Sequence, residues 1–238
     1  MRPGIDFVRD HLKELSPTVD NNLASSLMRI LDCYFASFRP KDGKPPPSAE
    51  SITNFVAGLD ELFIFCFIWS VGATTNDVGR QKFDSWLRAE MSTLGMGKQR
   101  PPANSDVYAC LYDHNQQKWV KWMETNDPFD MGTGKLAFSE IVVPTTDSVC
   151  NTYLLDLLVS NNQHLLMVGE TGTGKTINIS QYLQGLSKVQ RRTIDPSIIS
   201  LSLTFSATAS ANMTQDLLDS KFDKRKRGVF GPPAGKRC

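Results

Sequence analysis

The sequence predicts an α/β fold that is preceded by an all-helical unit. Two observations lead to this fold class. A glycine-rich loop at residues 169–176 follows a short apolar run and precedes a helical pattern, which is the order strand, loop, helix. Residues 4–92 instead carry apolar side chains at spacings of three and four, as amphipathic helices do. The 238 residues leave room for about one and a half domains.

Composition excludes several classes of protein. With 40% hydrophobic and 21% charged residues the chain is neither disordered nor fibrous, and its net charge of +1 creates no global field toward nucleic acid or membrane. Any anion site must therefore be local. The five cysteines form no CxxC pair and no metal-ligand pattern, which favours reduced thiols in the cytosol. The apolar run 62–69 is far shorter than the roughly 18 residues of a membrane span, and residues 1–10 lack a signal-peptide core.

The first predicted helix begins at Ser16 and Pro17, an N-cap followed by proline in the first turn. Its apolar residues recur at helical spacing as far as Phe38, and Arg39-Pro40 ends it. Residues 41–47 contain three prolines, which remove backbone donors and fix φ, so this stretch is expected to be an exposed loop.

Two more helices are expected before residue 92. One starts at Ser48 or Ser51, runs through residues 63–71, which are apolar on every side, and ends at Gly72 as a C-cap. Such a segment must be buried by its neighbours. The other starts at Asp77 and places Phe83, Trp86, Leu87 and Met91 on one apolar face.

Residues 93–138 are expected to connect this helical unit to the next. Residues 95–102 are rich in glycine, proline and lysine, as linkers are. Residues 107–112 and 119–122 carry β-branched and aromatic side chains on either side of an Asp-His-Asn turn, which predicts a hairpin.

The remaining elements are read from the last hundred residues. Residues 141–144 are extended, residues 153–159 have helical leucine spacing, residues 164–169 form a buried parallel strand, and residues 198–205 are a second strand candidate. The run at 221–227 is the densest in charge, and we interpret it as a solvated helix end rather than a nuclear-localisation or nucleic-acid patch. A loop follows at 228–235.

The chemistry lies in the loop that matches G-x-x-x-x-G-K-[ST] in full. Gly172 and Gly174 let the backbone turn and approach phosphate oxygens, so that N–H groups form an anion nest at a helix N-terminus. Lys175 is expected to reach the β- and γ-phosphates, and the Thr176 hydroxyl to be a ligand of Mg²⁺. A turn that merely joined strand to helix would have no need of Lys-Thr. The predicted phosphate-binding residues are Gly169, Glu170, Thr171, Gly172, Thr173, Gly174, Lys175 and Thr176.

Hydrolysis requires more than a phosphate loop. A hydrolytic P-loop protein also needs an apolar strand that ends in Asp, usually beside a second acid. After Thr176 the sequence offers only the strand candidate 198–205, which ends in Ser206-Ala207 rather than an acid. We therefore assign no catalytic residue, and we expect the isolated chain to hydrolyse ATP poorly or not at all.

Longer stretches of sequence resemble a known family. The runs VPTTDSV, LLDLL, GETGTGKT, LTFSATASANMTQ and KFDKRKRGVFGPPAGKR occur in the order found in the third AAA+ module of dynein heavy chains. Residues 63–88 resemble the helical lid that closes the second module, and axonemal heavy chains are more similar than cytoplasmic ones. The resemblance implies an α/β P-loop NTPase (AAA+) fold with an incomplete sheet after a helical lid. The expected divisions are a lid at 1–92, a connector at 93–138 and the first half of a P-loop module at 139–238.

The resemblance also implies function. The module would bind ATP or ADP with Mg²⁺ and regulate a minus-end-directed microtubule motor that drives ciliary movement. Ile141, Val142, Val143 and Pro144 would pack on adenine. The implied partners are other AAA+ modules of the same chain and, through the whole motor, intermediate and light chains and microtubules, with no nucleic acid and no membrane. The implied location is the cytoplasm and cytoskeleton, in the axoneme of a cilium or flagellum.

Dynein chains continue from this point into a Walker B strand, sensors and a lid, whereas the present sequence ends at Cys238. In AAA+ sheets those later strands lie between the two strands predicted here, so both would lack their neighbours. Two alternatives stay open. One is a small stand-alone P-loop kinase or NTPase that uses Asp216 or Asp219 as its acid, and the other is a non-enzymatic helical module that binds a partner through residues 63–71.

Overall fold

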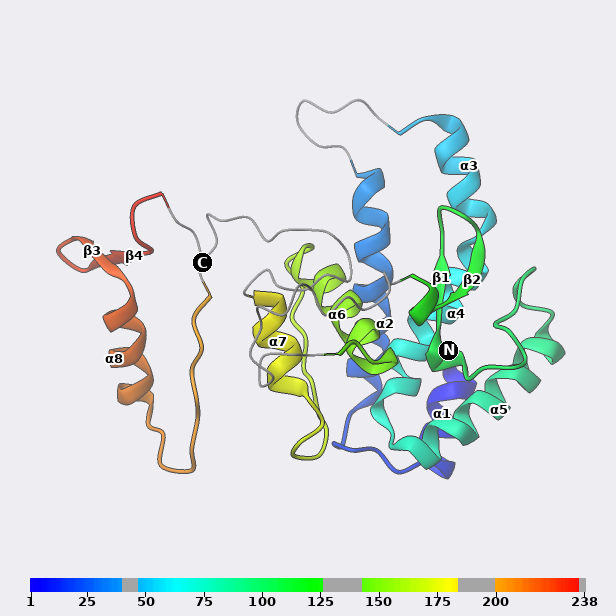
Figure 1. Cartoon of the computed structure of the whole chain (residues 1–238), viewed down its shortest axis with the longest axis horizontal. Coiled ribbons are helices and arrows are strands. Elements are labelled where there is room, and N and C mark those ends of the chain that lie inside the picture. The colour runs from blue at the N-terminus through cyan, green and yellow to red at the C-terminus, as the bar shows by residue number, and fades with distance from the viewer. Residues whose placement is uncertain (40–46, 126–142, 184–199, 236–238) are drawn as a thin grey trace. The chain divides into compact units, whose positions relative to one another are not determined.

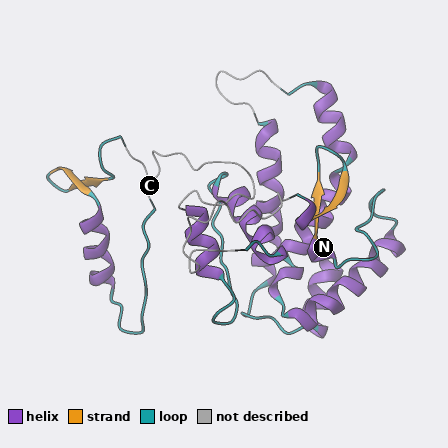
Figure 2. Cartoon of the chain, in the orientation of Figure 1, coloured by secondary structure: helices purple, strands orange, loops and turns teal. Residues whose placement is uncertain are grey.

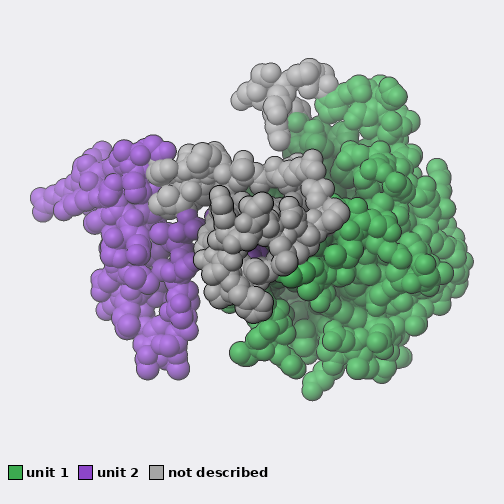
Figure 3. Space-filling view, in the orientation of Figure 1, with its two compact units in different colours: residues 1–179 green, residues 180–238 purple. Residues whose placement is uncertain are grey.

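The computed structural model of the chain describes residues 1–39, 47–125, 143–183 and 200–235 (Figure 1). These residues are mostly helical, with two short antiparallel hairpins (Figure 2). Contacts group the chain into two compact units, residues 1–179 and residues 180–238, which Figure 3 colours separately. Each unit is described by itself. The expected loop at 41–47 and the connector beyond residue 125 fall almost entirely outside the described residues.

The first unit begins with a helix that the sequence reading did not identify. Helix α1 spans Arg2–His11, with a proline in its first turn and Ile5 and Val8 buried. Helix α2, Asp20–Phe35, starts after Val19 rather than at Ser16, so the predicted start was wrong by several residues. Contacts with a distant segment explain the later start of α2. Glu14 pairs with Thr75 in a β-bridge, and the Leu15 amide donates to the Thr74 carbonyl at 2.9 Å. These bonds hold the chain outside the helix. A short 3₁₀ turn at Ala36–Phe38 follows α2.

The next predicted helix is in fact two helices. Helix α3 spans Ala49–Ala57, with the Ser48 side chain accepting from the Ser51 amide, and helix α4 spans Leu59–Ser70. They meet at Gly58. A Cβ on Gly58 would lie 2.4 Å from the hydroxyl oxygen of Tyr112, so a residue of strand β1 (Cys110–Asp113) comes close to the backbone at this break.

Helix α4 forms the centre of the first unit, as its uniform apolarity predicted. Phe65, Cys66 and Ile68 have no exposed surface, and α2 packs along the helix. Gly72 does not cap α4, because the cap is Val71. Gly72 instead opens a 3₁₀ turn, Gly72–Thr74, and a Cβ there would meet the Phe83 ring at 2.5 Å. Helix α5, Asp77–Leu94, begins as predicted after an Asn76 cap and ends at Gly95, whose φ is +62°.

The predicted hairpin is confirmed. Strands β1, Cys110–Asp113, and β2, Lys118–Lys121, pair antiparallel with Leu111 opposite Val120. Short 3₁₀ turns flank them at Val107–Ala109 and Trp122–Glu124. Trp122 is almost fully buried, and its Nε1 donates to the Tyr108 carbonyl at 2.9 Å.

The second unit differs from its prediction in three places. Residues 200–205 form no strand, and residues 198–199 of that candidate lie outside the described part of the chain. The charged run at 221–227 was predicted to be a helix end, but helix α8 spans only Ala211–Lys221. The basic residues that follow lie in strand β3, Asp223–Lys226. The expected loop contains strand β4, Val229–Gly231, which pairs with β3 across a turn at Gly228, where φ is +75°.

Within the described ranges, no single helix has the length and apolar composition to cross a membrane. One helix pair, 49–57 with 59–74, passes that test together, with a bend of 57° at the break.

Candidate functional site

The segment that leads to the phosphate loop begins with a well-defined helix start. Helix α6, Thr146–Val159, has a capping box in which the Ser148 amide donates to Thr145 Oγ1 at 3.2 Å and the Thr145 amide donates to Ser148 Oγ at 2.8 Å. Among the predicted adenine contacts, Val143 is 56% exposed and Pro144 is partly buried immediately before this cap. Ile141 and Val142 lie outside the described residues.

Helix α6 is fixed to the helical unit by aromatic side chains. The hydroxyl of Tyr153 lies 2.9 Å from that of Tyr34 on α2, and its ring centroid lies 5.2 Å from that of Trp122. Val149 and Cys150 on the same helix are buried. Burial raises the pKa of Tyr34 well above its usual range, and Tyr153 raises it further, so the Tyr34 hydroxyl stays neutral. Sequence reasoning missed this contact, because helical spacing identifies an apolar face without identifying what that face meets.

The strand expected at residues 164–169 is absent from the structure. Residues 163–170 form neither helix nor strand, and no described segment hydrogen-bonds alongside them. Leu166 is 83% exposed and Val168 is 46% exposed, so this apolar run is not covered as a central strand would be. A strand requires a neighbour for its N–H and C=O groups, which is why local pattern alone does not produce one here.

The glycines of the loop adopt the backbone conformation that a phosphate nest requires. Gly172 has φ of +86° and Gly174 has φ of +78°, and a Cβ at either position would meet nothing within 4 Å. These positions therefore need glycine for its left-handed backbone and not for lack of space. The loop runs directly into helix α7, Lys175–Leu183, where the Asn178 amide donates to the Gly174 carbonyl at 3.0 Å.

The lysine of the loop folds back over the loop itself. Its Nζ donates to the Gly169 carbonyl at 2.9 Å, to the Glu170 carbonyl, and to Thr173 Oγ1 at 3.1 Å. Thr173 Oγ1 in turn donates to the Glu170 carbonyl at 2.9 Å. All three protons of the ammonium are thus satisfied by loop oxygens. An incoming phosphate would exchange these bonds for charge-assisted ones rather than meet a free cation.

These features together are those of an anion site. The glycine conformations, the first turn of α7 and the Lys175 ammonium supply N–H and N⁺–H donors at one place. Thr176 is exposed in the first helical turn. The described residues contain no group of three or more His, Cys, Asp or Glu side chains that could hold a metal ion.

Asp216 and Asp219, the two acids that a stand-alone P-loop enzyme could use, both lie on helix α8. Asp216 is exposed on α8, and Asp219 Oδ1 accepts from Gln215 Nε2 at 2.8 Å one helical turn away. Among the described residues, neither has a histidine or a second carboxylate within hydrogen-bond distance.

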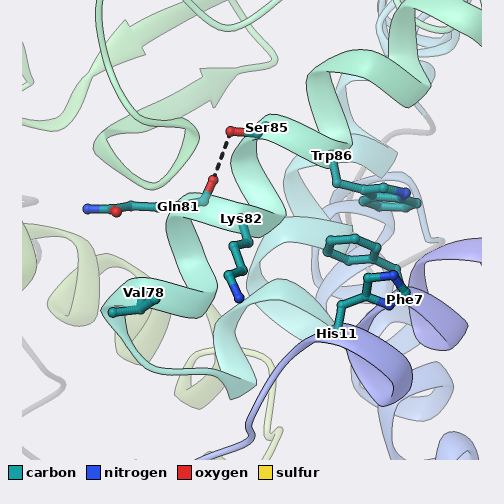
Figure 4. Close-up of a pocket in the computed structure, with 7 residues that line it drawn as sticks. All are labelled: Phe7, His11, Val78, Gln81, Lys82, Ser85 and Trp86. Atoms are coloured by element: carbon teal, nitrogen blue, oxygen red, sulfur yellow. Dashed lines mark hydrogen bonds between the residues drawn. The ribbon is translucent and has the colours of Figure 1, made fainter.

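A surface hollow lies elsewhere in the first unit, between α1 and α5 (Figure 4). The Phe7 ring stacks between Trp86 and His11, with centroid distances of 4.9 Å on both sides. The hollow has a volume of about 740 Å³. Its other lining residues are Val78, Gln81, Lys82 and Ser85. Its lining joins the two helices and contains no carboxylate and no paired nucleophile and base.

Comparison with known proteins identifies relatives for both parts of the chain. The family described as "Dynein heavy chain AAA lid domain" matches residues 1–124, and the one described as "P-loop containing dynein motor region" matches residues 132–238. Human dynein axonemal heavy chain 1 is 38% identical over 99% of this chain, and its mouse counterpart is 39% identical over 98%. The flagellar inner arm I1 dynein-1-beta heavy chain of Chlamydomonas reinhardtii is 34% identical over 75%. The chain spans 6% of the length of the human and mouse relatives and 4% of the algal one.

Proposed function

Because this chain belongs to the dynein heavy chain family, as a lid and P-loop segment of the AAA+ motor region, we propose that its residues 169–176 bind the phosphates of ATP or ADP. Membership of the family implies nucleotide binding, and it does not favour a stand-alone kinase or a purely helical interaction module. The observation that supports this site is local: two left-handed glycines and Lys175 converge at the start of α7.

Individual roles follow from these positions. The amides of Gly169, Glu170, Thr171, Gly172, Thr173 and Gly174 line the phosphates, Lys175 binds the β- and γ-phosphates once it leaves the Gly169 carbonyl, and Thr176 is a ligand of Mg²⁺. The bound cation neutralises phosphate charge. Val143 and Pro144, with Ile141 and Val142 before them, contact adenine.

The functional setting is drawn from the relatives. The segment acts inside a microtubule motor of the axoneme, where nucleotide at this module regulates the motor cycle and other AAA+ modules of the same chain are its neighbours. Intermediate and light chains and microtubules are reached through the whole motor. We assign the lid to residues 1–92, the connector to 93–138 and the P-loop half-module to 139–238. The relatives are axonemal and flagellar heavy chains, which supports this setting.

The direct test is equilibrium binding of a fluorescent ADP analogue with Mg²⁺. We expect the Lys175→Ala chain to bind roughly tenfold or more weakly, because a charge-assisted bond to phosphate is lost. Lys82→Ala, at an exposed lysine of α5, is the matched control and should bind as the unaltered chain does. Thr176→Ala should weaken binding only when Mg²⁺ is present. Equal affinity in the Lys175→Ala chain and the unaltered chain would refute the site.

ATP hydrolysis by the chain is measured separately from nucleotide binding. No acid-terminated strand follows the loop in this sequence, so the chain should show no phosphate release above background. Turnover that disappears in Lys175→Ala would contradict this part of the proposal while supporting the binding site.

A further inference from the structure

The β3–β4 hairpin presents a dense and exposed positive charge. All four residues of β3, Asp223–Lys226, are exposed, and the turn residue Arg227 is exposed as well. From Lys221 to Arg227 there are five basic side chains and one acidic one. The chain as a whole is nearly neutral, so this hairpin concentrates charge that the rest of the molecule does not show.

Most of these cations are not neutralised inside the described part of the chain. Arg225 donates to the Pro232 carbonyl, but no ion pair involves Lys224, Lys226 or Arg227 in the part of the chain that the structure describes. Some arginines elsewhere in the described chain are paired with carboxylates, as in Arg9 with Glu14 and Arg88 with Asp84. What distinguishes the hairpin is that several exposed basic side chains without an ion pair among the described residues follow one another in a single strand and turn.

The strand register adds an apolar neighbour to each lysine. Lys224 lies opposite Phe230 and Lys226 lies opposite Val229, with an irregularity between the two pairs. Residues directly opposite in an antiparallel pair project to the same face, so each lysine stands beside an apolar side chain. Val229 is 42% exposed and Phe230 is 45% exposed. Each pair therefore combines a cation with a partly exposed hydrophobic group.

We propose that this hairpin is a docking surface for an acidic protein segment that carries apolar residues among its carboxylates. Carboxylates complement the lysines, and apolar side chains of the partner cover Val229 and Phe230. Phosphate backbones would use the charge but leave Val229 uncovered, which favours a protein partner over a nucleic acid. The site is in the second unit and does not depend on the nucleotide proposal.

The test uses the whole chain and short fluorescent peptides in anisotropy titrations. The probes are a peptide of alternating glutamate and leucine, a peptide of glutamate alone, the lysine-leucine counterpart, and a short DNA duplex. The glutamate-leucine peptide should bind most tightly, and added salt should weaken it. Lys224→Gln with Lys226→Gln should weaken it roughly fivefold. Phe230→Ser should weaken the glutamate-leucine peptide more than the glutamate-only peptide.

Controls separate the hairpin from general charge. Lys82→Gln with Lys118→Gln removes the same charge from α5 and from the other hairpin, and should leave binding unchanged. Lys175→Ala should also leave it unchanged, which keeps this result distinct from nucleotide binding. Circular dichroism checks that each variant retains its helices. Equal losses in the two double variants, or tighter binding of duplex DNA through the same hairpin lysines, would overturn the proposal.

Discussion

The hydroxyl oxygen of Tyr34 on α2 lies 2.9 Å from the hydroxyl oxygen of Tyr153 on α6. The Tyr153 ring also meets the rings of Trp122 and Phe65, with centroids 5.2 Å and 6.4 Å away. This contact joins the helical lid to the helix that leads into the phosphate loop. Through Tyr153, helix α6 therefore packs against the core of the lid.

The tyrosine pair gives a measurable stability effect. Tyr34→Phe or Tyr153→Phe should each lower the free energy of unfolding by about 1 kcal/mol, because the remaining buried hydroxyl loses a partner. Urea denaturation of both single variants and the double variant measures the coupling. The double variant should lose less than the sum of the two single losses. Strict additivity would show that the two hydroxyls do not stabilise one another.

The helix break at Gly58 gives a second prediction, with a built-in rescue. Gly58 has φ of −106°, so its backbone does not require glycine, but a Cβ would lie 2.4 Å from the Tyr112 hydroxyl oxygen. Gly58→Ala should therefore destabilise the fold by about 1–3 kcal/mol through overpacking. Adding Tyr112→Phe removes the clashing oxygen and leaves the ring carbon Cζ at 3.3 Å. If the double variant is as unstable in denaturant as Gly58→Ala alone, the Tyr112 hydroxyl is not the cause of the destabilisation.

The buried cysteines should be unreactive in the folded chain. Burial raises the pKa of Cys33 to about 11, with Asp32 adding to the effect, and burial also raises the pKa values of Cys66, Cys110 and Cys150. Because the thiolate is the reactive form, an aromatic disulfide reagent at pH 8 should label these four far more slowly than it does in denaturant. Mass spectrometry of digested protein identifies each labelled residue. Rapid labelling of Cys66 or Cys150 without denaturant would contradict the described core.

His114 should make stability depend on pH in a defined direction. Burial lowers its pKa, with Asp113 opposing weakly, and its ring packs edge-on against Tyr34 and Phe55. A base with a lowered folded-state pKa favours the neutral form, so this contribution is complete above the unfolded pKa of about 6.5 and is lost as pH falls toward the folded value.

His114→Gln should reduce the loss of stability between pH 7.5 and pH 5.5, measured by denaturation at each pH. His164→Gln, at an exposed histidine, is the control and should leave that loss unchanged. A pH dependence that is equal in the His114→Gln chain and the unaltered chain would assign the effect to other groups.

Local signals predicted much of the helical architecture and the turn at the loop glycines, while phosphate binding by that loop stays a prediction. Ser48 and Asp77 marked helix starts correctly, and the uniform apolarity around Phe65 predicted the most buried helix. The helix starts, the apolar helix and the backbone conformation of the loop glycines all depend on residues that are close in the sequence. The resemblance to dynein heavy chains, carried by residues 63–88 and the loop, is confirmed by the family matches.

The predictions that were wrong concerned elements that depend on residues distant in the sequence. The start of α2 follows the segment that Glu14 and Thr75 hold in a β-bridge, and the break at Gly58 lies beside the hydroxyl of the distant residue Tyr112. A strand at 164–169 needs neighbouring strands, which no described residue provides. The basic run became β3 because Gly228 allowed a tight turn and Val229–Gly231 supplied the partner. Composition alone suggested a helix end.

Amide hydrogen exchange, with and without ADP and Mg²⁺, locates the bound phosphates along the chain and so shows whether the loop at 169–176 holds the nucleotide. We expect slower exchange at residues 172–176 in the presence of ADP, no change in the β1–β2 hairpin, and no protection in the Lys175→Ala chain. Protection of another segment, or protection of residues 172–176 that persists in Lys175→Ala, would contradict the assignment of this loop as the nucleotide site.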